Sequence, residues 1–307
     1  MRISHSTESA MGKWLGAIGL IFFSLTLSAA QPNPTNFIEF LRQRGSSGSL
    51  VSTANTKADQ IHPALKCITS DDPLEGHLIR EYGAIFAAAE TVTLPSKCIY
   101  KSSDEVNRLQ AGFMRRRARL AGSEIELQDA AMRALLSADG AALLSNLRLT
   151  PLDGSIAARR TYADSVRIWN KRFFPALDFW VSVGAISSEM SVVARNIPLV
   201  DQARKVMEWE KSGYLFGIGR TKSIFSSTAP PGASHHLSML AFDVVEYHDP
   251  ALTSILNNHG WFQTIVNDPP HFTYLGVGVT ALPSRGLKNV SYDGYSYWVP
   301  NITPPSN

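Results

Sequence analysis

Two short segments towards the C-terminal end of the chain gather two histidines and two aspartates. His236 and Asp243 are seven residues apart in the first segment, and Asp268 and His271 are three apart in the second. A catalytic zinc ion needs about three protein ligands, usually His or carboxylate, and an open position for water. It also needs a base beside that water. The two segments supply this set, with His236, Asp243 and His271 as ligands and Asp268 as base.

The sequence around each segment predicts a β-strand. Residues 239–245 alternate between an apolar face and a second face that includes Asp243. Asp243 can therefore project from a strand into a cleft, while His236 lies on the loop that leads into it. His271 opens a second strand over residues 271–277, and the two prolines before it stiffen the bend that holds Asp268. A stiff bend suits a base that must stay within reach of the reacting water.

The order of these residues resembles a known signature. Residues 234–243 resemble the S-x-H-x-x-G-x-A-x-D motif of zinc D-alanyl-D-alanine carboxypeptidases of the VanY type, and residues 268–271 resemble their [D/E]-x-x-H motif. Four positions of the first motif match, namely Ser234, His236, Ala241 and Asp243. Met239 stands where Gly is usual, and Asp268 replaces the commoner Glu. The spacing of the motif selects His236 as the ligand, although His235 precedes it directly.

Other interpretations of the same residues are simpler. An H-x6-D spacing alone is common, and His235, His248 and His259 all fit surface positions. Asp268 before a proline can merely start a turn. An isolated His271 would more often be a packed side chain than a ligand. The joint order of S-x-H, the alanine, the aspartate and D-x-x-H favours the zinc site over these interpretations.

An arginine upstream resembles a further element of the same family, the S-G-Y-R-S-x-x-x-Q segment. Aligned in this way, Arg160 is the functional arginine at the start of a helix, Thr161 stands where Ser is usual, and Ser165 where Gln is usual. A guanidinium can hold a peptide's terminal carboxylate through two hydrogen bonds or polarise the scissile carbonyl. Arg159, one residue away, and Arg220 remain alternatives for this role.

The resemblance implies a fold, a cofactor and a reaction. The expected fold is α+β, with a small antiparallel sheet that carries the zinc site, helices packed on it, and an N-terminal, mainly helical part. One Zn²⁺ per chain is held by His236, Asp243 and His271. By this resemblance, the expected substrate is a peptidoglycan stem peptide, from which metal-activated water would remove a terminal D-Ala. Asp268 and Arg160 are then catalytic, and Arg160 and Ser234 contact the substrate, with Ser234 also placed to orient His236.

Two further functions stay open. A zinc-binding module that recognises the cell wall without turnover would keep the ligands and lose the reaction, since a fold does not fix a function. A peptidoglycan endopeptidase would need a site that is open at the Arg160 end, because an exopeptidase must close over a terminal carboxylate.

The N-terminal region predicts export. Residues 14–27 form an uncharged apolar run, and the small residues 28–30 suit cleavage, so that residues 1–30 are interpreted as a signal peptide. An uncleaved membrane anchor is the alternative, at the lower limit of about 17–25 residues for a span. The mature protein is expected to be secreted or periplasmic, without stable membrane insertion. Residues 31–60 are expected to form a linker, residues 61–146 an N-terminal helical part, and residues 147–307 the peptidase-like core.

Composition adds a disulfide and argues against nucleic acid. An exported chain with a single pair of cysteines, Cys67 and Cys98, suggests one disulfide. The formal net charge is only +3, and the one dense basic cluster, residues 115–119, lacks interleaved aromatic residues. We therefore expect this cluster to be a solvated helix face and expect no nucleic-acid partner.

Several elements away from the site are also predicted. Helices are expected over residues 36–44, 103–120, 175–183, 200–209 and 250–259, with a further helix that starts at a capping box of Ser123 and Glu126 and stops at Gly140. A helix beginning near Tyr162 is expected to bury Trp169 and Phe173 on one face. Short strands are expected over residues 147–150 and 214–218.

Overall fold

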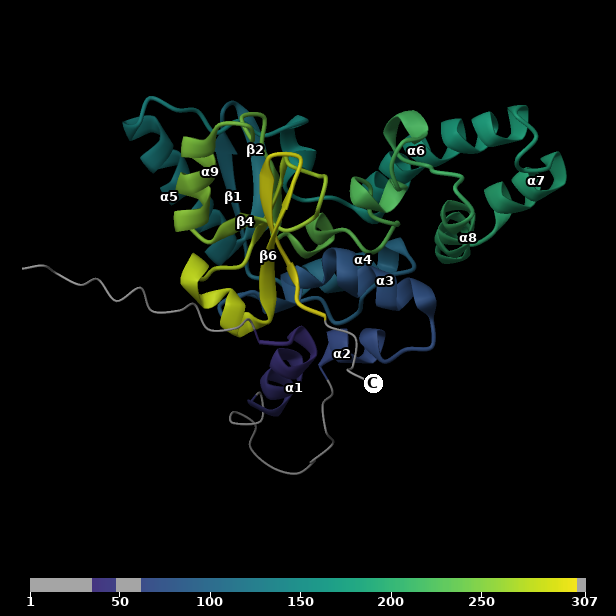
Figure 1. Cartoon of the computed structure of the whole chain (residues 1–307). Helices are drawn as coiled ribbons and strands as arrows, with labels where there is room; N and C mark the ends of the chain where they lie inside the picture. The colour runs from purple at the N-terminus through teal and green to yellow at the C-terminus, as the bar shows by residue number, and fades with distance from the viewer. Residues whose placement is uncertain (1–34, 48–61, 303–307) are drawn as a thin grey trace, which may run out of the picture. The chain divides into compact units, whose positions relative to one another are not determined.

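The fold is α+β, as predicted, with small antiparallel sheets and helices packed against them (Figure 1). This computed structural model describes residues 35–47 and 62–302. The predicted signal peptide and most of the predicted linker lie outside the described residues. Among the described residues, no helix combines the length and the apolar character needed to cross a bilayer.

The helices follow the chain from the predicted linker onwards. They are α1 (Phe37–Ser47), α2 (Pro63–Ile68), α3 (Pro73–Tyr82), α4 (Ser103–Ala111), α5 (Asp129–Leu144), α6 (Tyr162–Ser182), α7 (Ser188–Asn196), α8 (Leu199–Lys211) and α9 (Pro250–Asn258). The last helix begins as predicted, with the Asp249 side chain accepting hydrogen bonds from two backbone N–H groups and Pro250 in the first turn.

A three-stranded antiparallel sheet positions the metal motif. Its strands are β3 (Ala241–Asp243), β4 (Trp261–Gln263) and β5 (His271–Tyr274), in the order β3-β5-β4. The register pairs Asp243 directly with His271. Directly opposed residues in an antiparallel pair have their Cβ atoms about 4.5–5.5 Å apart. The pairing therefore brings together two donors that are far apart in the sequence.

The strand before Asp243 is shorter than predicted, because Met239 does not belong to it. Met239 has φ 54° and ψ 34°, in the left-handed region, and ends a 3₁₀ turn over His235–Ser238. This conformation favours glycine, which gives a physical reason for the glycine that is usual at this position of the motif. A methionine is accommodated here with its side chain completely buried.

The basic cluster forms a strand rather than the predicted helix face. Helix α4 stops at Ala111, and residues 115–120 form β1, which pairs with β2 (Ser123–Gln128). A two-residue turn at Ala121 and Gly122, both with positive φ, fixes this hairpin. Arg115 and Arg117 both lie within 4 Å of the Glu126 carboxylate on the facing strand. The predicted capping box at Ser123 is consequently wrong, since both of its residues lie in β2.

Four other predicted elements differ. Helix α5 passes Gly140 and ends at Leu144, before Asn146 adopts a left-handed conformation with φ 57°. Residues 147–150 form no strand, and Pro151 makes only an isolated bridge to Val244. Residues 214–218 form no strand either, because the Glu210 carboxylate, not a partner strand, binds the Phe216 N–H. The helix expected from residue 175 is the second half of α6, which runs through Pro175.

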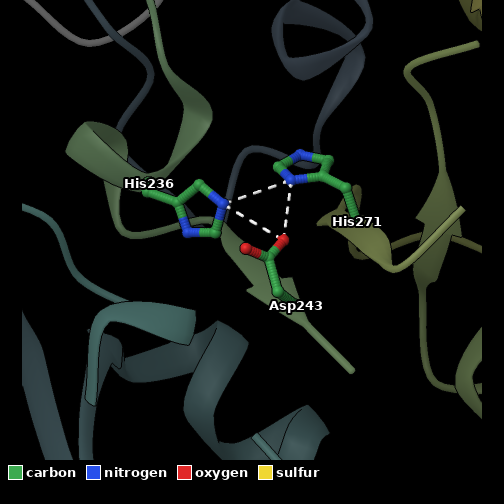
Figure 2. Close-up of side chains that lie close together, drawn as sticks. All are labelled: His236, Asp243 and His271. Carbon is green, nitrogen blue, oxygen red and sulfur yellow. Dashed lines mark hydrogen bonds and ion pairs between the residues drawn. The ribbon is translucent and has the colours of Figure 1, made fainter. Parts of the chain in front are cut away.

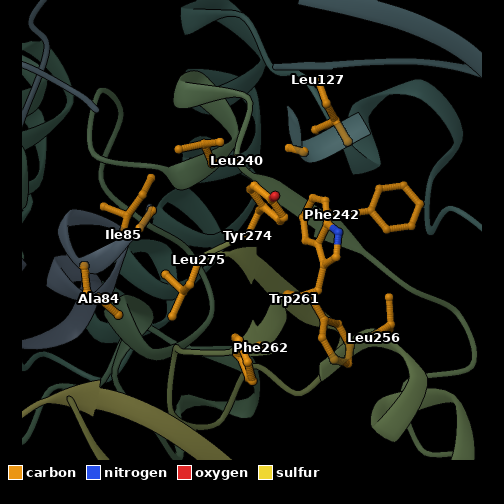
Figure 3. Close-up of a cluster of buried hydrophobic side chains, with 14 of the residues drawn as sticks. Ala84, Ile85, Leu127, Leu240, Phe242, Leu256, Trp261, Phe262, Tyr274 and Leu275 are labelled. Carbon is orange, nitrogen blue, oxygen red and sulfur yellow. The ribbon is translucent and has the colours of Figure 1, made fainter. Parts of the chain in front are cut away.

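The described residues form two main hydrophobic cores. We call the first the sheet core; it joins the central sheet to α1, α5 and α9 and includes Phe37, Leu41, Leu135, Leu240, Phe242, Leu256, Trp261, Phe272 and Tyr274. Figure 3 shows part of this core, around Leu240, Phe242, Leu256, Trp261 and Tyr274. We call the second the helical core; it joins α3, α6, α7 and α8 and includes Leu78, Trp169, Phe173, Leu177, Val206, Trp209, Phe225 and Ile265. Trp169 and Phe173 are buried as predicted. The remaining strands, β6 (Leu287–Tyr292) and β7 (Tyr295–Pro300), form a separate hairpin.

The two cysteines are bonded, as the sequence predicts. Cys67 of α2 and Cys98 have Cα atoms 6.4 Å apart. Tyr100, two residues beyond Cys98, forms a backbone hydrogen bond of 3.0 Å to the carbonyl of Gly232. A Cβ on Gly232 would lie 1.8 Å from the Tyr100 carbonyl oxygen. The disulfide therefore holds a segment that packs directly on the chain leading into the metal motif.

Replacing both cysteines by alanine should lower the free energy of unfolding by about 3–4 kcal/mol, from the loop-closure entropy of a 31-residue separation. Urea unfolding with and without reductant measures this effect. The wild-type protein should lose the same stability on reduction, while the double variant should be insensitive to reductant. A loss below about 1 kcal/mol would show that noncovalent contacts alone hold the segment.

Candidate metal centre

Three buried donors meet at one point, as the sequence predicts. His236 lies in the 3₁₀ turn, Asp243 on β3 and His271 on β5 (Figure 2). His236 Nε2 is 3.2 Å from His271 Nδ1 and 3.3 Å from Asp243 Oδ1, and His271 Nδ1 is 3.1 Å from the same oxygen. These atoms form a nearly equilateral triangle.

The triangle fits a zinc ion. Donors bound at about 2.0–2.1 Å in a tetrahedral arrangement lie about 3.4 Å from one another. The three observed separations fall only slightly below that value. Two imidazoles and one carboxylate are a donor set that zinc accepts, whereas magnesium and calcium prefer oxygen donors throughout. His236, Asp243 and His271 can therefore hold a zinc ion and leave a further coordination position.

The backbone fixes the orientation of the His236 ring. His236 Nδ1 lies 2.8 Å from the carbonyl oxygen of Ala158. A carbonyl can only accept, so Nδ1 carries the proton and Nε2 is left with a lone pair that faces the other donors. Burial lowers the pKa of His236 to about 4, helped by the positive charge of Arg160. The ring is therefore neutral at pH 7, which is the form that binds metal.

Arg160 holds the second oxygen of Asp243. Arg160 Nη2 donates to Asp243 Oδ2 at 2.6 Å, and Arg160 Nε donates to the Ile156 carbonyl at 3.0 Å. Burial would raise the pKa of the Asp243 carboxyl, but the neighbouring His236 and Arg160 hold it well below its usual range. Asp243 is thus an anion with Oδ1 presented to the two histidines.

A capping box sets the position of Arg160. The Thr161 hydroxyl accepts a hydrogen bond from the Asp164 N–H, and the Asp164 carboxylate accepts one from the Thr161 N–H. This box starts α6 directly after the arginine. The predicted helix start is therefore confirmed, and the side chain of Thr161 stabilises it.

His235 does not occupy the surface position that its sequence context suggested. Its side chain is buried, at 2% exposure, and Nε2 lies 2.6 Å from the Tyr82 carbonyl oxygen. Burial lowers the pKa of His235 to about 3, with a further contribution from His271. His235 is thus a neutral buried ring behind the metal donors.

Asp268 lines the same cavity as His236 and His271. A tight bend holds it, with Asn267 at φ 69° and the Asp268 carbonyl accepting a hydrogen bond of 3.1 Å from the His271 N–H. Burial raises the pKa of the Asp268 carboxyl to about 7, while His271 and then Arg160 act in the opposite direction. A bound cation would act in the same direction as His271 and Arg160 and lower the pKa of Asp268.

The structure distinguishes the three candidate arginines. Arg160 lines the cavity, whereas Arg159 turns away and donates to Gln110 at 2.8 Å and to Glu126 at 3.3 Å. Arg220 stacks on the Phe179 ring, 3.9 Å from its centroid, and does not line this cavity. Among the three, only Arg160 is placed with the metal donors.

Ser234 also lines the cavity, and its hydroxyl accepts a hydrogen bond of 3.4 Å from the His236 N–H. Sequence reasoning did not single out the remaining cavity residues, which include Tyr82, Ile168, Ser227, Thr228, Ala229 and Ile265. The Ser227 Oγ is buried without a hydrogen-bond partner among the described residues. These residues come from four separate parts of the chain, and no local pattern marks them.

Similarity to known proteins is found among solved structures. No protein-family profile matches the chain, and no curated protein matches it. Among solved structures, the chain is similar to a mutant of the vancomycin-resistance D,D-pentapeptidase VanY from a VanB-type resistance cassette, crystallised in complex with Zn(II). The identity is 15%, the match covers 62% of this chain and 89% of the other, and the TM-score is 0.34. We therefore base the functional conclusion on the donors and contacts of this chain.

Proposed function

We propose that this protein is a zinc-dependent peptidase that hydrolyses peptidoglycan stem peptides and removes a terminal D-Ala. The observation that supports this proposal is the buried triangle of two histidines and one aspartate, with Asp268 in the same cavity. Structural zinc sites are closed by four protein ligands, whereas catalytic sites leave one position open. Three donors beside a carboxylate match the catalytic type.

Different residues of the chain have separate roles in the proposed reaction. A zinc ion held by His236, Asp243 and His271 would acidify a water molecule and polarise the scissile carbonyl. Asp268 accepts the proton at its carboxylate as the water attacks, and it can return the proton to the leaving amine. Ser234 positions the His236 backbone and faces the substrate.

The two terminal nitrogens of the Arg160 guanidinium group have different roles in the proposed site. Nη2 is engaged by Asp243, while Nη1 makes no hydrogen bond with the described part of the chain. This second nitrogen lies on a group that lines the cavity and is 17% exposed. It is available to the oxyanion or to the carboxylate of a peptide substrate.

Export to an oxidising compartment is part of the proposal. The N-terminal 30 residues fit a signal peptide, and the Cys67–Cys98 bond is of a kind that persists outside the cytosol. Both features suit a protein whose substrate is the cell wall.

One experiment separates the proposed function from its alternatives. Zinc stoichiometry of the purified protein is measured alongside D-Ala release from a muramyl pentapeptide, before and after chelation. We expect one zinc per chain and release that chelator abolishes. Zinc without release, but with cleavage of cross-linked peptidoglycan, would indicate the endopeptidase. Zinc with neither reaction would indicate a binding module, and a protein without zinc would exclude the proposal.

Replacing Arg160 by alanine should lower kcat/KM by about 10²–10³ at saturating zinc, the usual cost of losing one donor to a developing oxyanion. Arg159→Ala is the matched control, because Arg159 faces Gln110 and Glu126 instead of the cavity. Steady-state kinetics with the pentapeptide measure both variants. Equal losses in the two variants would contradict the assignment of Arg160.

A further inference from the structure

We propose that His235 is a positioning residue for the metal centre: it accepts a hydrogen bond from His271 Nε2 and so keeps His271 Nδ1 turned towards the metal. The proposal rests on the proposed zinc site. It gives a function to the second histidine of the His235–His236 pair, which the ligand set leaves unused.

The contacts place His235 directly behind the ligand His271. His271 Nε2 is 3.3 Å from His235 Nδ1 and 3.3 Å from the Thr273 hydroxyl. That hydroxyl is in turn 3.0 Å from His235 Nδ1 and 2.7 Å from the Thr264 hydroxyl. One ring nitrogen of His271 therefore faces the other two metal donors, His236 and Asp243. The second ring nitrogen faces a buried polar cluster that includes His235 and Thr273.

The far side of His235 determines which of its nitrogens can accept. His235 Nε2 lies 2.6 Å from the Tyr82 carbonyl oxygen. Because a carbonyl only accepts, Nε2 must carry the proton, and in the neutral ring Nδ1 is then an acceptor. An acceptor facing His271 Nε2 favours the tautomer of His271 that has its proton on Nε2 and a lone pair on Nδ1.

The surroundings hold the His235 ring in place. The Tyr82 ring packs edge-on against it, with centroids 5.9 Å apart and an interplanar angle of 86°. The Tyr82 hydroxyl is anchored by the Phe225 carbonyl. Helix α3, the 3₁₀ turn and β5 thus meet at His235. Adjacent residues of one turn then supply one ligand directly, His236, and orient the second ligand, His271.

His235 cannot itself be a ligand of the same ion. The three donor atoms are His236 Nε2, Asp243 Oδ1 and His271 Nδ1. His235 contacts the opposite nitrogen of the His271 ring, so the ring stands between it and the metal. A supporting role and a purely packing role remain, and they predict different results for a polar replacement.

Two variants separate these roles. Gln at position 235 can donate its amide N–H to Tyr82 and accept from His271 through its amide oxygen, whereas Leu can do neither. We expect His235→Leu to raise the zinc dissociation constant about 10–100-fold, the usual effect of losing such a partner, and His235→Gln to stay within about 3-fold of wild type. Competition with a chromophoric chelator measures the dissociation constants without reference to activity.

The outcomes are distinct. Equal zinc affinity in wild type and His235→Leu, or equal losses in both variants, would overturn the proposal. Long-range ¹⁵N–¹H spectra of the wild-type protein distinguish the supporting role of His235 from a purely packing role even if a variant fails to fold. The expected spectra show protons on Nε2 of His235 and on Nε2 of zinc-loaded His271; a proton on His235 Nδ1 would overturn it. Absence of zinc binding by the wild type would refute the proposed function instead, while the His235 tautomer would still test the hydrogen bond.

Discussion

His236→Ala should lose zinc and hydrolytic activity together. His236 Nε2 is one corner of the donor triangle, and the ring is buried, so that its removal leaves only Asp243 and His271 as donors. Four-ligand zinc sites bind with about 10–16 kcal/mol, so one ligand is worth about 3–4 kcal/mol, or a factor of about 10²–10³ in affinity. Metal analysis after dialysis against a weak chelator, and D-Ala release from a pentapeptide, measure the two losses.

The control is His259→Ala. His259 lies at the end of α9, where its Nδ1 contacts the Ile255 carbonyl at 2.8 Å, and it does not line the metal cavity. This variant should keep its zinc. Stoichiometric zinc in His236→Ala at wild-type affinity would show that the ligand set is wrong.

Asp268→Asn should keep zinc and lower kcat by about 10²–10⁴, the usual contribution of a general base. The amide has nearly the same size as the carboxylate and preserves the bend before Pro269, but it cannot accept the proton. Burial raises the pKa of the carboxyl to about 7 in this structure. The positive charge of a bound zinc ion would lower that pKa and keep Asp268 ionised at neutral pH.

The comparison needs zinc content and turnover from the same preparation. Asp293→Asn is a suitable control, since Asp293 lies in the exposed β6–β7 turn with φ 49°, a conformation that Asn also tolerates. Loss of zinc in Asp268→Asn would make Asp268 a ligand and not a base. Unchanged kcat would assign the base to another group.

The sequence predicted which three side chains, His236, Asp243 and His271, the fold brings together, because they lie in two short segments with strong local patterns. The S-x-H turn, the strand ending at Asp243 and the prolines before His271 each constrain their own geometry. Antiparallel pairing then allows only a few registers, and the observed register places Asp243 opposite His271. Most of the centre could therefore be anticipated without coordinates.

The supporting contacts could not be anticipated. The Ala158 carbonyl that orients His236 and the Tyr82 carbonyl that binds His235 are backbone groups, 78 and 153 residues away in the sequence. A backbone carbonyl has no sequence signature. The surface position suggested for His235 was wrong for this reason, since its burial depends on helix α3 packing against the turn.

The errors in secondary structure have a local cause as well. Arginine, leucine and alanine favour helices, so residues 103–120 were predicted as a single helix. The Ala121–Gly122 turn and the cross-strand ion pairs with Glu126 stabilise a hairpin instead. Met239 was placed in a strand because it falls on the same face as Asp243 in the two-residue alternation of residues 239–245, and this alternation carries no information about a positive φ.

The cavity lies where the two hydrophobic cores meet, and this arrangement has an evolutionary consequence. The metal donors are flanked by Leu240, Phe242 and Phe272 of the sheet core, while Ile265 on the cavity wall belongs to the helical core and Ala229 packs against it. Substitutions that repack the helical core can reshape this wall while the donors stay in register. Under the proposed function, such substitutions would change which peptides the cavity accepts and leave the three candidate metal ligands in place.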